Sequence, residues 1–98
     1  MKALFLISAA AAAWLASSAQ AQAPSGMAVL KAKGCLGCHD MRKAKVGPAF
    51  TEVASKYEGI ADAEKQLLAK LKEGKGHMKA SATDAELRAA LKEILAAQ

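Results

Sequence analysis

Aromatic residues make up only 4% of the 98-residue chain, which also has only two prolines and two cysteines. A small domain with so few bulky rings rarely stabilises itself by side-chain packing alone. No segment alternates polar and apolar residues as a half-buried strand does, and there is no internal repeat. Basic runs interleaved with aromatics are also missing, so nothing indicates nucleic-acid binding. These absences favour a small all-α domain that needs a further stabilising component.

The first 21 residues have the pattern of a secretory signal peptide. A lysine at position 2 precedes a charge-free apolar run over residues 3–16, which is too short to span a bilayer comfortably. Small residues in an A-x-A pattern follow, so we expect cleavage after Ala21, with Ala23 as the other candidate. An uncleaved membrane anchor is the alternative. Cleavage leaves a domain of residues 22–98 in the periplasm, with no stable membrane insertion.

The sequence Cys-Leu-Gly-Cys-His at residues 35–39 is the C-x-x-C-H signature of c-type haem attachment. On one helical turn Cys35, Cys38 and His39 share a face. Two thiols can therefore bond the two vinyl groups of one porphyrin while the imidazole binds its iron. We predict one covalently bound haem c as the cofactor. The macrocycle would fill the centre that few aromatic side chains leave open.

Three other interpretations of this motif are possible. A thioredoxin-like dithiol needs a βαβ setting, which the sequence does not show. A zinc site could use both cysteines, His39 and His77, but zinc ligands usually come in spaced pairs rather than the contiguous Cys38-His39. A plain disulfide between Cys35 and Cys38 leaves His39 without a role.

Apolar spacing and capping residues predict about four short helices in the domain. Proline and glycine signals predict two functional loops between them, over residues 40–48 and 74–82. The expected helices are one capped by Ser25 that runs to about Lys33, one over Phe50–Tyr57 ended by Gly59, one from an Asp62 cap to Gly74, and one that begins at the T-x-x-E box of Thr83 and Glu86.

A haem bound through His39 has a second axial position, for which the domain offers four candidates. Met27 lies on an apolar helix face and is expected to fill core space. Met41 follows His39 too closely to fold back across the ring. Met78, in the glycine-rich second loop, is the favoured ligand because a thioether there suits ferrous iron and raises the potential. His77 is the rival, and the sequence leaves that choice open.

Four segments together resemble the small bacterial monohaem class I cytochromes c: residues 35–39, 45–50, 53–57 and 74–78. The resemblance implies a helical bundle wrapped around the haem, with the first and last helices crossing. It also implies that His39 is the proximal ligand and Met78 the distal one. In such proteins the carbonyl of Pro48 would accept a hydrogen bond from the other ring nitrogen of His39, which fixes the imidazole.

We therefore expect a soluble, monomeric periplasmic electron carrier that cycles between Fe(III) and Fe(II) and is not an enzyme. The formal charge of +5 at pH 7 is compatible with steering toward redox partner proteins that have an acidic docking face. Other possible functions are a haem c subunit of a periplasmic oxidoreductase complex, a haem gas sensor with a labile distal ligand, and a thiol oxidoreductase. The lysines expected near the exposed haem edge are Lys43, Lys45, Lys75 and Lys79.

Overall fold

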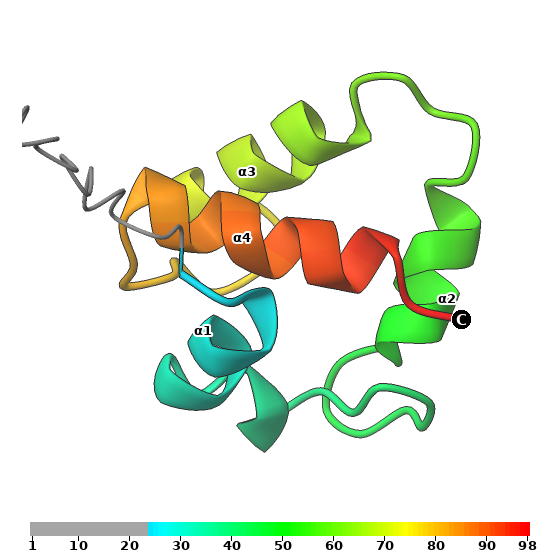
Figure 1. Ribbon diagram of the computed structural model, residues 1–98, viewed down its shortest axis with the longest axis horizontal. Coiled ribbons are helices and arrows are strands. Elements are labelled where there is room, and N and C mark those ends of the chain that lie inside the picture. The colour runs from blue at the N-terminus through cyan, green and yellow to red at the C-terminus, as the bar shows by residue number, and fades with distance from the viewer. Residues whose placement is uncertain (1–23) are drawn as a thin grey trace, which may run out of the picture.

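The computed structural model describes residues 24–98, and that part of the chain contains helices and no strand. This confirms the all-α prediction, whereas the predicted signal peptide at residues 1–21 lies outside the described range. None of these helices is both long and apolar enough to pass through a membrane. In chain order the elements are α1 (Gly26–Ala32), the 3-10 turn η1 (Cys35–Gly37), α2 (Phe50–Lys56), α3 (Ala63–Glu73) and α4 (Asp84–Leu95) (Figure 1).

Helix α4 is the element on which the other three helices pack. It contacts α1, α2 and α3, while within residues 24–98 those three helices make no substantial contact with one another. In Figure 1 α4 (orange to red) runs across the middle of the molecule, with α1 (cyan) on one side and α3 (yellow-green) on the other. The first three helices are therefore held around a common centre through α4 alone.

The apolar face of α4 supplies four of the ten buried core residues in the described chain, more than any other helix. Leu91 is 2% exposed and Leu30 of α1 is fully buried against the same cluster. Burying one such leucine contributes about 1.5–3 kcal/mol relative to leaving it in water. The remaining buried members of the cluster are Val29, Phe50, Leu67, Ala90 and Ile94.

A glycine allows α1 to cross α4 at close range. A β-carbon built on Gly26 would lie 2.7 Å from the β-carbon of Glu93 and would overlap the backbone oxygen of Ala89. Because only a residue without a side chain fits there, Gly26 sets the distance between the two helices. The crossing of first and last helices that the resemblance implied is thus present.

Two of the three predicted N-caps are made as expected. The Ser25 hydroxyl accepts a hydrogen bond from the Ala28 N–H at 3.4 Å, and Thr83 and Glu86 form a reciprocal capping box. Asp62 occupies the N-cap position of α3, but its side chain does not cap the helix. Its φ and ψ of −105° and 24° are not the extended conformation of a capping residue.

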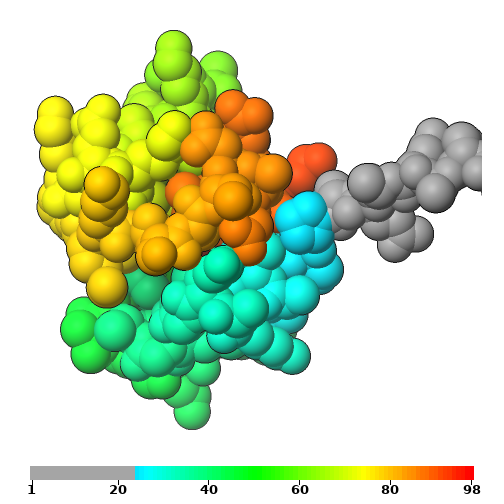
Figure 2. Space-filling view, turned by 90° about the vertical axis from the view of Figure 1, so that its left-hand side faces the viewer, coloured from blue at the N-terminus to red at the C-terminus, as the bar shows by residue number. Residues whose placement is uncertain are grey.

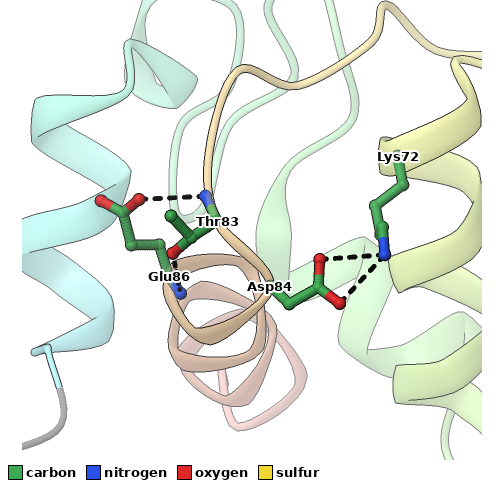
Figure 3. Close-up of polar contacts among 4 residues, drawn as sticks. All are labelled: Lys72, Thr83, Asp84 and Glu86. Atoms are coloured by element: carbon green, nitrogen blue, oxygen red, sulfur yellow. Dashed lines mark hydrogen bonds and ion pairs between the residues drawn. The ribbon is translucent and has the colours of Figure 1, made fainter.

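The start of α4 is also tied to the end of α3. The Lys72 ammonium lies 2.9 Å from each carboxylate oxygen of Asp84. Figure 3 shows this pair beside the capping box of Thr83 and Glu86. Both groups are partly exposed, so the pair contributes little energy. Its position matters more, because it joins the two ends of the loop at residues 74–82.

Gly26→Ala should destabilise the folded protein by about 1–3 kcal/mol, since the added methyl group must displace backbone of α4. Thermal unfolding of the purified protein with its native cofactor content measures the change. Ala28→Ser is the matched control, because Ala28 is exposed on the same helix. Equal unfolding temperatures for Gly26→Ala and the parent would contradict the close crossing.

Candidate haem-binding site

A short turn after α1 brings the C-x-x-C-H side chains to one wall. Gly34, with φ of 75°, turns the chain out of α1 and into η1. The Cys35 carbonyl then accepts hydrogen bonds from the N–H groups of Cys38 at 3.3 Å and His39 at 3.0 Å. The predicted helical turn is thus a 3-10 turn continued by one α-type bond. All three side chains line the same pocket.

Both cysteine side chains are half-buried, and no disulfide joins them. Burial raises the pKa of the Cys35 thiol above its ordinary value, and a backbone hydrogen bond acts in the opposite direction.

The imidazole of His39 is held from three directions. Its Nδ1–H donates a hydrogen bond to the carbonyl of Pro48 at 2.6 Å. The ring stacks on Phe50, with centroids 4.9 Å apart and an angle of 21° between planes. Gly47 lies so close that a β-carbon there would be 2.8 Å from both ring nitrogens. This arrangement fixes the tautomer and the orientation, and leaves Nε2 as the nitrogen available to a metal.

The loop at residues 40–48 is folded so that its end returns to His39. The Asp40 carboxylate accepts hydrogen bonds from the backbone N–H groups of Arg42 and Lys43 at 3.0 and 3.1 Å. The bond from Arg42 is the main reason that the pKa of Asp40 is lowered. Gly47 N–H donates to the Cys38 carbonyl at 2.8 Å. The Pro48 contact with His39 is therefore a product of the loop's own hydrogen bonds.

Two adjoining pockets lie at the centre that α1, α2 and α3 surround. Their volumes are about 290 and 220 Å³, and the cysteines line the smaller one. Buried apolar side chains of α4 form part of both walls. The residues common to the two pockets are His39, Phe50, Leu71, His77 and Ile94.

The loop at residues 74–82 forms the wall opposite the C-x-x-C-H turn. In Figure 2 this loop (yellow to light orange) meets the segment after α1 (teal) on the same face of the molecule. The His77 ring faces inward, with its centroid 6.0 Å from that of His39 and the planes 7° apart. Met78 lines the smaller pocket but is 74% exposed. Met27 and Met41 pack against the core instead.

The lysines around the pockets differ from those expected. Of the four predicted, only Lys79 lines either of these two pockets. Lys45 instead donates to the Leu36 carbonyl at 3.2 Å, and Lys75 pairs with Glu73 at 3.3 Å. The sequence reasoning missed three other lysines that line the pockets, two within helices and one directly after α1, because it considered only the loops. Each lies beside an apolar helix face, which is the signal that could have found them. They are Lys33, Lys56 and Lys70.

The alternative interpretations of the motif receive no support from this geometry. Residues 24–98 contain no group of three or more histidine, cysteine or acidic side chains placed to hold a metal ion, so the proposed four-residue zinc site does not form. The same range has no strand for a thioredoxin-like βαβ unit. A haem fits better, because two thiols and one oriented imidazole line an apolar hollow between helices that do not pack on each other.

No protein-family model matches the chain. Several individual proteins do match it. The chain is 52% identical over 44 residues to cytochrome c-552 of Hydrogenobacter thermophilus, and this matched stretch covers 45% of this chain and 45% of that protein. It is 43% identical over 63 residues to cytochrome c-551 of Allochromatium vinosum, covering 61% of this chain and 67% of that relative. The chain belongs to the small class I monohaem cytochromes c.

A solved structure agrees with this family assignment. The class 1 cytochrome MtoD from Sideroxydans lithotrophicus ES-1 superposes with a TM-score of 0.63 at 26% identity, over 71% of this chain and 89% of MtoD. The match to other relatives is partial: the cytochrome spans about half the length of cytochrome c-552 and of cytochrome c2 of Rhodocyclus tenuis. Members of the family carry one covalently attached haem c, and the two cysteines of this cytochrome suit that attachment.

Gly47→Ala should displace the His39 imidazole, because a methyl group does not fit between the loop and a ring already backed by Phe50. We expect a loss of about 1–3 kcal/mol in stability together with an altered haem absorption spectrum. Gly59→Ala is the control: its φ of 76° strains alanine, but no neighbouring atom lies within 4 Å of the added methyl group. That variant should lose stability and keep the parent spectrum. An unchanged spectrum in Gly47→Ala would refute the positioning role.

Cys35→Ser combined with Cys38→Ser should yield a largely unfolded chain without haem, because three helices then have only α4 to pack on. Far-ultraviolet circular dichroism and the haem absorption of the purified protein measure both effects. A compact and highly helical product without haem would show that the side chains alone suffice.

Proposed function

We propose that this cytochrome is a periplasmic electron-transfer protein whose haem c is attached to Cys35 and Cys38. The haem supplies an iron that alternates between Fe(III) and Fe(II), and no bond of a substrate is broken. The observation that carries the proposal is the state of His39: its Nδ1 is committed to Pro48 at 2.6 Å, and its ring is fixed beside the two thiols. Such an imidazole is prepared to be the proximal ligand.

The surrounding residues would keep the iron in a dry, fixed setting. Phe50, Leu67, Leu91 and Ile94 line the larger pocket with apolar surface. A haem held against these side chains would be largely shielded from water. Fewer water molecules would then have to reorient when the iron gains or loses an electron. This is the property that an electron carrier needs.

We further propose Met78 as the distal ligand. Its loop lies opposite the C-x-x-C-H turn, and a thioether favours ferrous iron. Because the Met78 side chain is 74% exposed, ligation requires this side chain to turn inward. Support for the assignment comes from ligand chemistry and from the position of the loop.

Export to the periplasm is proposed from the pattern of residues 1–21. Partner proteins would be recognised by charge. Lysines from α2 and α3, from the end of α1 and from the second loop border the pockets, so a partner with an acidic face would meet positive charge around the haem. Association with such a partner should slow as ionic strength rises.

Met78→Ala should lower the reduction potential by on the order of 0.1 V, within the roughly 0.8 V range over which axial ligands set haem potentials. It should also abolish the weak far-red absorption band that methionine ligation gives to ferric haem. Protein-film voltammetry and optical spectra of the oxidised protein measure the two changes.

Met27→Ala is the matched control, because it removes a thioether that packs against the core. It should reduce thermal stability and leave both the potential and the far-red band as in the parent. If Met78→Ala kept the parent's band and potential, Met78 could not be the ligand.

A further inference from the structure

His77 and His39 share one arrangement on opposite walls of the haem site. The Nδ1–H of His77 donates to the carbonyl of Met78 at 2.6 Å, as the Nδ1–H of His39 donates to that of Pro48 at 2.6 Å. Each imidazole therefore has its Nδ1 occupied by backbone and its Nε2 available to a metal. A backbone carbonyl on Nδ1 is the usual support of a metal-binding histidine.

The two rings also lie at a distance that suits a shared metal ion. Their centroids are 6.0 Å apart and their planes differ by 7°. The rings are stacked, and metal–imidazole bonds are about 2 Å long in zinc sites. At this separation both rings are close enough to reach one central ion by turning their Nε2 atoms toward it. His77 lines both pockets and is half-buried, whereas the neighbouring Met78 is 74% exposed.

The segment that contains these two residues is tied down only at its ends. Gly74 N–H donates to the Lys70 carbonyl and Ala80 N–H to the Leu71 carbonyl, each at 2.9 Å. In the described part of the chain, no backbone-to-backbone hydrogen bond starts or ends within residues 75–79. Gly74 and Gly76 have φ of 71° and 69°, so the flanking backbone already uses conformations open to glycine. Few backbone hydrogen bonds therefore oppose a rotation of this segment that would turn Met78 inward in place of His77.

We propose that His77 is an alternative distal ligand, which binds the haem iron in place of Met78 whenever Met78 leaves it. This inference rests on the proposed function, in which Met78 is the distal ligand. In this exchange the Met78 sulfur would leave the iron and the His77 Nε2 would take its place. No electron would be transferred, and the Nδ1 proton would stay on the His77 ring, hydrogen-bonded to the Met78 carbonyl. A small external ligand would then have to displace His77, so loss of Met78 alone would not leave an open gas-binding site.

The test compares Met78→Ala with the double variant Met78→Ala/His77→Ala, using carbon monoxide as the probe. In Met78→Ala we expect low-spin ferric iron whose electron paramagnetic resonance spectrum is that of a haem with two imidazole ligands. In the double variant we expect high-spin iron. Because carbon monoxide must displace His77, its apparent Kd for ferrous Met78→Ala should be at least roughly tenfold higher than for the double variant.

Two further variants serve as controls. His77→Ala alone should keep the far-red methionine band, which shows that the loop still folds onto the haem. Met78→Ala/Lys79→Ala should match Met78→Ala, because Lys79 is the other nitrogen donor next to Met78 in this loop. Retention of the covalent haem in every variant is checked from the absorption of the denatured protein.

Each result decides between distinct conclusions. If Met78→Ala and the double variant have the same spin state and carbon monoxide affinity, His77 does not bind and the inference is wrong, while Met78 ligation stands. Low-spin iron in the double variant with the same electron paramagnetic resonance spectrum as in Met78→Ala would assign the site to another donor and would also overturn it. If Met78→Ala is indistinguishable from the parent, the assignment of Met78 itself fails.

Discussion

The packing of three helices on α4, and not on one another, is the constraint on which the rest of this cytochrome depends. In a helical domain of ordinary composition, α1, α2 and α3 would bury apolar side chains against each other. Here their inner faces border two pockets that share His39, Phe50 and His77. A covalent macrocycle would supply the missing contact surface, and cofactor binding would then be coupled to folding.

The two sides of the site differ in the number of contacts that hold their residues in place. On the proximal side, His39 is fixed by the Pro48 carbonyl, the Phe50 ring and the closeness of Gly47. On the distal side, the loop at residues 74–82 is fixed at its ends by backbone hydrogen bonds and by the Lys72–Asp84 pair, and its middle has no comparable bonds within the described chain. The proximal wall is therefore rigid, whereas the middle of the distal loop is held by fewer contacts.

Much of the fold follows from local sequence signals. Ser25, Thr83 and Glu86 cap helices as their residue types predict, because capping depends on neighbouring backbone N–H groups. Asp62 shows the limit of this reasoning. Its φ of −105° and its hydrogen bond with Gln66 Nε2 at 2.9 Å are set by the turn before α3. A residue type alone does not reveal that conformation.

The candidate site was predictable where the sequence fixes geometry within a few residues. Cys35, Cys38 and His39 share one turn, so their convergence follows from spacing alone. Which lysines border the pockets depends on how whole helices are placed, and Lys33, Lys56 and Lys70 were missed for that reason. The inward position of His77 and the exposed one of Met78 likewise depend on the course of a loop without regular structure.

The place of α4 at the end of the chain has a consequence for biogenesis. A polypeptide that is synthesised amino-terminus first delivers α1, η1, α2 and α3 before the surface on which they pack. Until residues 84–95 emerge, the two thiols cannot be enclosed by the finished bundle. The order of helices thus leaves an interval in which an enzyme that joins porphyrin to sulfur can reach both cysteines in an open chain.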